Sequence, residues 1–316
     1  MGAWVELDGL INVLKPPGMS SHDVVAFVRR ISGIRRVGHA GTLDPGAAGV
    51  LVICVGPATR ATAYLQASDK SYRAEMVLGV ATDTQDASGR TMAIRTDFEL
   101  DWSEVDAALA RMVGTIEQRP PMASAVHWQG RRLYELARQG IEVQRPARQV
   151  DVYQVSVVAV WPRDADKARF GARVLFDVTC GPGTYVRTLC ADVGERLGCG
   201  AHLSFLVRTR SGAFSVKESV SLEELEAAAR HRRLADYLLP VDVGLGHLPA
   251  VSLSRADATR VRHGASVPWP AHVSRPGDLE AGDLVRVYDP DGRLLAVARL
   301  SERPAGWLLP DRVFAR

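Results

Sequence analysis

The sequence has no long apolar run, few aromatic residues and no cysteine arrangement typical of a disulfide framework or a zinc site. Its longest apolar stretch, Val50–Val55, is far shorter than the roughly 20 residues that a membrane-spanning helix needs. Residues 1–9 contain no basic stretch followed by an apolar one, so no secretory signal is predicted. The four cysteines form no CxxC pair. We therefore expect a cytoplasmic protein with reduced thiols, no bound metal and no membrane association.

Lysine is also scarce, because only Lys15, Lys70, Lys167 and Lys217 of the 39 basic residues are lysine. This bias is compatible with a GC-rich genome and carries little information about function. The chain has 316 residues, of which 47% are hydrophobic and 24% are charged. Such a chain can form one large and one small globular domain, and it is neither a disordered tail nor a fibrous repeat.

The distribution of charge is more informative than the net charge of +3. Residues 119–148 contain six arginines and only two acidic residues, Glu135 and Glu142. A basic segment of this kind suits a polyanion partner, and a solvated surface is the other interpretation that its composition allows.

Apolar spacing predicts a mixture of strands and helices. Strands are expected at 10–14, 50–55, 72–78, 150–160, 173–179 and 205–210, and helices at 20–33, 58–66, 102–113, 132–139, 184–197 and 222–231. The order is irregular and shows no repeating βαβ unit, so we expect an α+β fold with a largely antiparallel sheet. After about residue 246 a short helix at 255–263 and a hairpin around 289–292 predict a small, mostly β domain.

Residues 38–49 form the most unusual segment of the chain. Four glycines and one proline in twelve residues predict a tightly bent loop before a buried strand, and His39 and Asp44 lie within it. Loops on a rigid scaffold often carry catalytic groups. The glycine spacing matches neither a phosphate-binding loop nor a dinucleotide-binding motif. Read alone, Asp44-Pro45 is also a common opening of a turn.

The segment from Gly38 to Arg60 resembles the signature loop of the TruB family, bacterial enzymes that convert the T-loop uridine of tRNA to pseudouridine. Other blocks follow in the family's order, at 12–21, 70–73, 79–86, 121–125, 133–140, 183–188 and 197–203. The resemblance implies an α+β pseudouridine-synthase fold with a mainly antiparallel mixed sheet. It implies a catalytic domain at 1–246 with an RNA-clamping insertion at about 119–148, and a small, mostly β, PUA-like RNA-binding domain at 247–316.

The same resemblance implies that Asp44, Tyr72 and Arg187 are catalytic. Isomerisation must break the N1 glycosidic bond and rejoin the base through C5, and bond cleavage builds positive charge on the anomeric carbon. An ionised Asp44 could stabilise that charge, form a covalent sugar adduct or remove a sugar proton, and the sequence leaves these three roles open. Arg187 would oppose the rise in the pKa of Asp44 that burial causes. Such an isomerisation needs no cofactor.

The resemblance further implies that His39 fills the space left when the target uridine is flipped out of its loop. Tyr185 stands two residues before Arg187, so on an extended segment the two side chains would face the same side. The remaining residues expected to contact the substrate are Lys15, Arg131, Arg132 and Arg138.

The sequence thus predicts a monomeric tRNA pseudouridine synthase that acts on uridine-55 in the T-arm of tRNA, without a cofactor or a protein partner. Two alternatives use the same scaffold, a non-catalytic RNA-binding or RNA-folding protein and a pseudouridine synthase that acts on other RNAs. The first would not require Asp44, Tyr72 and Arg187. A glycoside hydrolase would need a second carboxylate, for which the sequence offers no obvious partner motif.

Overall fold

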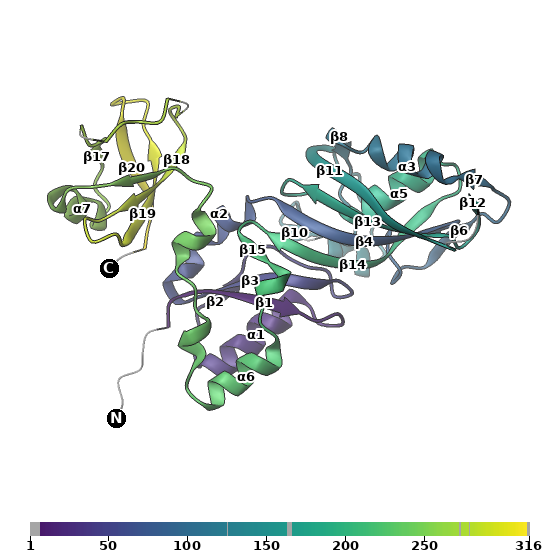
Figure 1. Cartoon of the computed structure of the whole chain (residues 1–316), viewed down its shortest axis with the longest axis horizontal. Coiled ribbons are helices and arrows are strands. Elements are labelled where there is room, and N and C mark those ends of the chain that lie inside the picture. The colour runs from purple at the N-terminus through teal and green to yellow at the C-terminus, as the bar shows by residue number, and fades with distance from the viewer. Residues whose placement is uncertain (1–6, 125, 163–165, 272, 278, 315–316) are drawn as a thin grey trace.

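The computed structural model describes residues 7–124, 126–162, 166–271, 273–277 and 279–314. Residues 1–6, which belong to the N-terminal segment without a predicted secretory signal, lie outside the described residues. Ala125, in the family-like block at 121–125, also lies outside them. The described chain forms a large mixed domain and a smaller C-terminal β domain (Figure 1).

A nine-stranded sheet spans the large domain (Figure 1). Its strands are β1 (Gly9–Lys15), β2 (Val37–His39), β3 (Ala48–Val55), β4 (Lys70–Leu78), β8 (Gly114–Gln118), β11 (Arg148–Trp161), β13 (Arg173–Cys180), β14 (Ala201–Ser211) and β15 (Phe214–Ser215). The main order is β1-β3-β14-β4-β13-β11-β8, with β2 on β3 and β15 on β14. Neighbouring strands are antiparallel except β3 and β14, which are parallel. The predicted α+β class with a mainly antiparallel mixed sheet is therefore confirmed.

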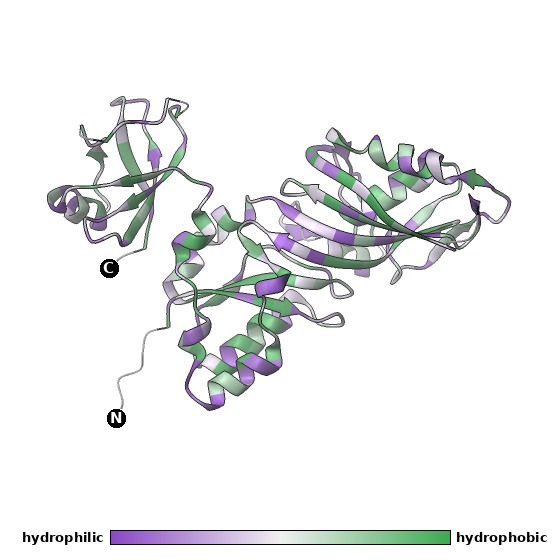
Figure 2. Cartoon of the chain, in the orientation of Figure 1, coloured by the Kyte–Doolittle hydropathy of each residue, from purple (hydrophilic) through white to green (hydrophobic). Residues whose placement is uncertain are grey.

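Helices cover the two halves of this sheet separately. Helices α1 (Ser21–Ser32) and α6 (Leu222–Arg230) share a core with β1 and β3, whereas α3 (Trp102–Ala110) and α5 (Val186–Arg196) share one with β4, β11, β13 and β14. The remaining helical elements of the large domain are η1 (Gly56–Ala61), α2 (Thr62–Gln66), α4 (Leu133–Arg138), η2 (Val216–Glu218), η3 (Leu234–Tyr237) and η4 (Val241–Leu245). In Figure 2 the strands of the large sheet carry green segments interspersed with purple and pale ones, and α1 and α6 likewise show both green and purple, as expected for elements with one buried face.

Local sequence explains α1 well. Ser20 and Asp23 form a reciprocal capping box at its start, and Gly33 ends it with a left-handed φ of 71°. Val24 and Val28 are buried at helical spacing, against the β1–β3 half of the sheet. Burial of one such valine stabilises the fold by about 1.5–3 kcal/mol.

Residues 119–147 leave the edge of the sheet and return to it. Gln118, the last residue of β8, pairs with Arg148, the first residue of β11. Between them the chain forms a two-stranded ribbon of β9 (His127–Trp128) and β10 (Arg131–Arg132), followed by α4. The intervening basic segment is thus an excursion from the end of an antiparallel strand pair.

Short strand pairs lie at the end of the large domain that is farther from the C-terminal domain (Figure 1). These are β5 (Val80–Thr82) with β6 (Thr91–Ile94), and β7 (Leu100–Asp101) with β12 (Lys167–Ala168). No helix in the described part of the chain is long and apolar enough to cross a membrane. All four cysteines are buried and unpaired.

The C-terminal domain has its own sheet and core. Its strands, in the order β16-β18-β19-β20-β17, are β16 (Ala250–Ser252), β18 (Leu284–Tyr288), β19 (Leu294–Leu300), β20 (Trp307–Val313) and β17 (Val267–Pro268), with α7 (Arg255–Arg262) packed against them. The hairpin expected around 289–292 is present as β18 and β19. Tyr64 bonds Asp311, and Arg60 donates to the Val313 carbonyl at 2.7 Å, so this domain packs against α2 and the turn before it.

Strands β1, β3 and β14 meet at Gly49. Gly49 pairs with Lys15 on one side and with Arg208 on the other, and its φ is 108°. A Cβ added at Gly49 would lie 2.2 Å from the Arg208 carbonyl oxygen. The close approach of the three strands therefore requires glycine at this position.

We expect Gly49→Ala to lower the free energy of unfolding by about 1–3 kcal/mol or more. Both the left-handed backbone conformation and the close Arg208 backbone oppose a side chain at this position. Gly46→Ala is the matched control, because a Cβ there would meet no atom within 4 Å and its φ is ordinary. Urea unfolding of both variants measures the difference. Equal stabilities would show that the strand junction tolerates a side chain.

Candidate active site

The loop that carries Asp44 is shorter than the glycine pattern predicts. His39 belongs to β2, and Ala48 and Gly49 belong to β3, so only residues 40–47 lie between strands. Within the loop the Ala47 N–H donates to the Asp44 carbonyl at 3.0 Å, which closes a tight turn. The parallel pairing of β3 with β14 then places Asp44 close to the middle of the sheet.

Two buried cations hold this loop through its backbone carbonyls. Lys15 is fully buried and donates to the Pro45 carbonyl at 3.2 Å. Arg208 is 1% exposed and donates to the carbonyls of Thr42 at 3.3 Å and Gly41 at 3.1 Å. Burial lowers the pKa of Lys15 to about 8, although the Asp44 carboxylate opposes that shift. Lys15 thus supports the loop, and Arg208 is a supporting residue that sequence reasoning missed.

Ser21, at the start of α1, anchors the same loop from the other side. The Leu43 N–H donates to Ser21 Oγ at 2.9 Å, and Ser21 Oγ donates to the Leu43 carbonyl at 3.1 Å. Ser21 is 1% exposed, so these bonds form away from water. The loop is consequently fixed from β1, α1 and β14 at once.

Asp44 forms an ion pair with Arg187 of α5. The Arg187 Nη2 atom lies 3.2 Å from Asp44 Oδ2, and the same nitrogen donates to the Ala123 carbonyl at 2.8 Å. The Arg187 side chain is 4% exposed, whereas that of Asp44 is 39% exposed, so the carboxylate remains open to a ligand. Burial raises the pKa of Asp44 above its ordinary value, and the Arg187 guanidinium opposes that rise.

Asp86 is a second carboxylate on the same guanidinium. Its Oδ2 atom lies 3.5 Å from Arg187 Nη1. Its Oδ1 atom accepts from the Thr84 hydroxyl at 2.7 Å and from the Ser88 N–H at 2.9 Å. Asp86 is therefore held firmly and orients Arg187. Sequence reasoning assigned it no role, although it ends the family-like block at 79–86.

Tyr185 and Arg187 do not share an extended segment, so that prediction was wrong. Tyr185 is the N-cap of α5, and Arg187 lies within its first turn. The Arg187 Cζ atom is still 5.8 Å from the centre of the Tyr185 ring, because the helix begins between them. Gln118, which is 2% exposed, accepts from the Tyr185 N–H at 2.7 Å and donates to its carbonyl at 3.1 Å. The base of the inserted segment thereby fixes the start of α5.

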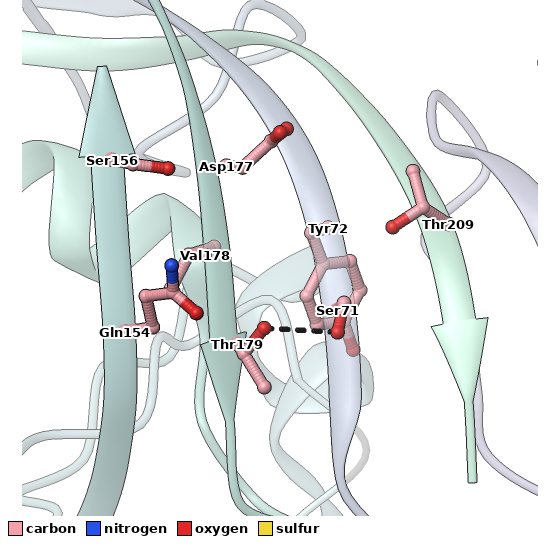
Figure 3. A pocket seen from close by; sticks show the side chains of 8 residues that line it. All are labelled: Ser71, Tyr72, Gln154, Ser156, Asp177, Val178, Thr179 and Thr209. Carbon is pink, nitrogen blue, oxygen red and sulfur yellow. Dashed lines mark hydrogen bonds between the residues drawn. The ribbon is translucent and has the colours of Figure 1, made fainter. Parts of the chain in front are cut away.

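Tyr72 lies on β4, directly opposite Arg208 of β14. Burial raises the pKa of its hydroxyl, and Arg208 opposes this rise. Tyr72 also contributes to a hollow of about 230 Å³ in which Ser71 and Thr179 share a hydrogen bond of 3.0 Å (Figure 3). The residues that line the hollow do not include Asp44 or Arg187, so we place the candidate site at the ion pair and not there.

His39, at the end of β2, is half-buried and meets the ring of His22 edge to face, with 5.4 Å between ring centres. Burial, followed by the charges of His22 and Arg208, lowers the pKa of His39 to about 4. Its Nδ1 atom is buried and has no hydrogen-bond partner among the described residues. His39 therefore presents a neutral ring beside the loop at neutral pH.

The arginines expected to bind substrate lie on the inserted segment. Arg131 donates to the Gln139 side chain at 2.8 Å, and the Arg132 and Arg138 guanidinium groups lie 6.0 and 5.4 Å from the Tyr134 ring centre. The charge of Arg132 also helps to lower the pKa of His39, which places this arginine on the side of the Asp44 loop. The structure thus brings Arg132 towards the site, while Arg131 and Arg138 are exposed.

The described residues contain no group of three His, Cys, Asp or Glu side chains that could hold a metal ion. The chemistry open to the site is that of the partly open Asp44 carboxylate, a buried guanidinium that Asp86 also pairs with, and two tyrosines. An ionised carboxylate with one open face can stabilise a developing positive charge or attack an electrophilic carbon.

Family models match most of the chain. The model described as TruB family pseudouridylate synthase (N terminal domain) matches residues 29–186, and that described as tRNA pseudouridylate synthase B C-terminal domain matches residues 187–246. The protein named tRNA pseudouridine synthase B of Moorella thermoacetica is 48% identical over 302 residues, which cover 95% of this chain and 96% of that protein. The protein of the same name from Symbiobacterium thermophilum is 51% identical over 261 residues, 83% of each chain.

Solved structures support the fold. A chain in the crystal structure of a Cbf5-Nop10-Gar1 complex matches with a TM-score of 0.74 and 29% identity, over 97% of this chain and 84% of that chain. A chain in the structure of an H/ACA RNP bound to a substrate RNA containing 2'-deoxyuridine also has a TM-score of 0.74, at 26% identity, over 98% of this chain and 85% of that chain. The predicted pseudouridine-synthase fold is thereby confirmed.

We expect the His39 ring to titrate near pH 4 and not near its ordinary value of 6.5, because burial disfavours the charged form. Since the unfolded chain gains this proton near pH 6.5, stability should fall as the pH is lowered from 6.5 towards 4. His39→Gln should remove that part of the loss. Imidazole NMR signals give the titration midpoint, and urea unfolding at pH 7 and pH 5 gives the stability difference. A midpoint near 6.5 would contradict the burial argument.

Proposed function

The chain belongs to the TruB family of pseudouridylate synthases, and from this premise we propose that it converts uridine-55 in the T-loop of tRNA to pseudouridine, with Asp44 as the catalytic carboxylate. The chain is thus an isomerase, a tRNA pseudouridine synthase. The observation that carries the proposed mechanism is the pairing of a partly open Asp44 with a buried Arg187.

The proposed chemistry starts at the glycosidic bond. Cleavage between N1 and the anomeric carbon leaves positive charge on the sugar, and the ionised Asp44 is the anion that lies open to it. Burial raises the pKa of Asp44 and so works against ionisation, whereas Arg187 favours the ionised form at the pH of the cell. Stabilisation of the charged sugar, formation of a covalent sugar adduct and removal of a sugar proton all require an ionised Asp44.

Tyr72 and Tyr185 are the aromatic side chains that we assign to the uracil ring. Tyr185 is fixed at the start of α5 next to Arg187, and the charge of Asp44 contributes to the raised pKa of both hydroxyls. A flat base held against such rings gains roughly 1–3 kcal/mol from stacking. We propose that Tyr72 stacks on the uracil while Lys15 keeps the Asp44 loop in place beneath the sugar.

The target uridine must leave the stack of its loop before it reaches Asp44. We assign the vacated space to His39, whose ring is neutral and lies at the border of the Asp44 loop. Its buried Nδ1 atom has no partner among the described residues, so RNA could supply one. Arg132 lies on the same side, which supports contact of the inserted segment with the same loop of RNA.

We propose that residues 1–246 form the catalytic domain and that the insertion at about 119–148 clamps the T-arm. We propose that residues 247–316 form a PUA-like domain that binds RNA. The separate core of the C-terminal β domain supports this division. The contacts of the insertion support its proposed role as a clamp, because Gln118 and the Ala123 carbonyl connect its base directly to Tyr185 and Arg187.

The decisive test is incubation with an unmodified tRNA transcript, followed by mapping of pseudouridine at single-nucleotide resolution. We expect one modified position, in the T-loop. A protein that only binds or folds RNA would leave every uridine unchanged, and a synthase for other RNAs would leave the T-loop uridine unchanged.

We expect Asp44→Asn to slow isomerisation by at least about 1,000-fold, equivalent to about 4 kcal/mol of barrier, while the fold and tRNA affinity stay near wild type. The change is nearly isosteric and removes only the charge. The matched control is Asp97→Asn at an exposed site. Single-turnover rates and filter binding separate the two effects, and an Asp44→Asn rate within tenfold of wild type would refute the catalytic role.

We expect combined Arg131→Gln, Arg132→Gln and Arg138→Gln to weaken tRNA binding and to flatten its salt dependence, by about one unit of slope for each phosphate that is no longer bound. The rate of the bound complex should change much less. The control is the same change of charge at exposed Arg95, Arg111 and Arg196. An unchanged slope in filter-binding titrations would mean that the insertion is only a solvated surface.

We expect His39→Ala to slow the reaction more on a folded T-arm hairpin than on a hairpin whose loop stacking is already broken, because extrusion of a stacked base costs more. Single-turnover rates of wild type and variant on both RNAs give the two ratios. Equal reductions on the two hairpins would exclude the base-flipping role.

A further inference from the structure

Helices α1 and α6 run side by side in the same direction and end at the same place. The start of α1 follows the Lys15 end of β1 after five residues, and the Leu14 N–H donates to the Val220 carbonyl, two residues before α6, at 2.8 Å. At the other end of β1 the Leu10 N–H donates to the Leu239 carbonyl at 2.8 Å. The segments that follow both helices therefore return to the Gly9 end of β1, because Val37 pairs with Val55, which itself pairs with Gly9, and Leu239 bonds Leu10.

Seven arginines gather at these two helix ends. We call them the helix-end patch: Arg29, Arg30, Arg35, Arg36, Arg230, Arg232 and Arg233. All seven are exposed. Glu226 connects the two helices, at 3.6 Å from Arg30 and 3.3 Å from Arg230, and Asp236 pairs with Arg233 at 2.7 Å. Glu226 and Asp236 thus pair with three of the seven guanidinium groups.

Part of this charge has an ordinary structural explanation. Cations in the last turn of a helix interact favourably with its dipole, which accounts for Arg29, Arg30 and Arg230. Arg35 and Arg232 lie beyond the helices, and their side chains have no ion pair or hydrogen bond with other described residues. The dipole effect does not explain why arginine occupies these two positions.

Arg232 also stands where the backbone favours glycine. The Arg233 N–H bonds the Ala228 carbonyl and the Arg232 N–H bonds the Ala229 carbonyl, which is the Schellman pattern of a helix end. The residue at the turn has a left-handed φ of 57° and is Arg232, whereas α1 ends with Gly33 in that conformation. An arginine kept in a strained conformation, with its side chain in solvent, suggests a role outside the fold.

We propose that the helix-end patch binds the phosphate backbone of tRNA outside the T-arm, an inference that rests on the proposed function. The patch lies roughly 20 Å from the Asp44 loop, since β1 spans seven residues between them. Lys15 marks the active-site end of that strand and Gly9 the patch end. An RNA bound to the patch is therefore distant from the loop that enters the site.

The position of the C-terminal domain agrees with this inference. Val55, at the end of β3, pairs with Gly9, and the chain continues directly into η1 and α2. Arg60 and Tyr64 of these elements contact the C-terminal domain. The helix-end patch and the C-terminal domain thus lie at the same end of β1 and β3, where one extended polyanion could meet both.

The test compares two RNAs, a full-length tRNA transcript and a T-arm hairpin, with an Arg35→Gln/Arg232→Gln variant. We expect the variant to lose affinity for the full-length tRNA and to lose about two units of salt slope, because two phosphates are no longer bound. Its affinity for the hairpin and its single-turnover rate on the hairpin should equal those of wild type. The control is Arg95→Gln/Arg111→Gln, with the same change of charge at exposed positions.

Arg232→Gly separates binding from folding. Glycine relieves the left-handed strain, so this variant should be at least as stable as wild type in urea while its affinity for full-length tRNA falls. A merely structural arginine would change stability and leave affinity alone.

Three results would overturn the proposal: the variant loses affinity for both RNAs alike, it loses affinity for neither RNA, or the control variant loses as much affinity. The second result is also the one expected if the patch binds a protein instead of RNA. Turnover of the hairpin by wild type tests the proposed function itself. The two failures are therefore distinguishable.

Discussion

The site depends on one buried guanidinium. Arg187 is almost completely shielded from water, and a charge in that position is tolerated only when it is paired and hydrogen-bonded. Its partners come from three segments that are distant in sequence, namely Asp44 before β3, Asp86 after β5 and the Ala123 carbonyl in the insertion. Because these three acceptors meet at one guanidinium, the segments that supply them are tied together at the site, and the fold and the site constrain each other.

The carboxylate is positioned by the backbone around it as much as by its ion pair. Lys15 and Arg208 donate to loop carbonyls from β1 and β14, and Gly49 lets those strands approach closely. Burial lowers the pKa of Lys15, because burying its charge is unfavourable. The protein tolerates this cost where the loop that carries Asp44 must be rigid. The protein thus combines a rigid loop with a carboxylate that is left partly open.

Charge on the surface is divided among separate places. The insertion carries Arg132 on the side of the Asp44 loop, and the helix-end patch lies at the other end of β1. Gln118 and Ala123 connect the insertion to α5, so contact with RNA there would be felt directly at Arg187. A long polyanion that meets several surfaces gains affinity without adding groups to the site itself.

The sequence by itself determined the local features of this protein. Capping by Ser20 and Asp23, the termination at Gly33 and the alternation along β4 depend on near neighbours, and the loop around Asp44 carries a long and specific motif. The domain limits and the roles of the site residues stay predictions. Only the tertiary structure decided which distant residues meet: Asp86 and Arg208 at the site, Gln118 at the start of α5, and the arginines at two helix ends. Sequence spacing could not show these contacts, because hydrogen bonds and ion pairs act over a few ångströms in space regardless of separation along the chain.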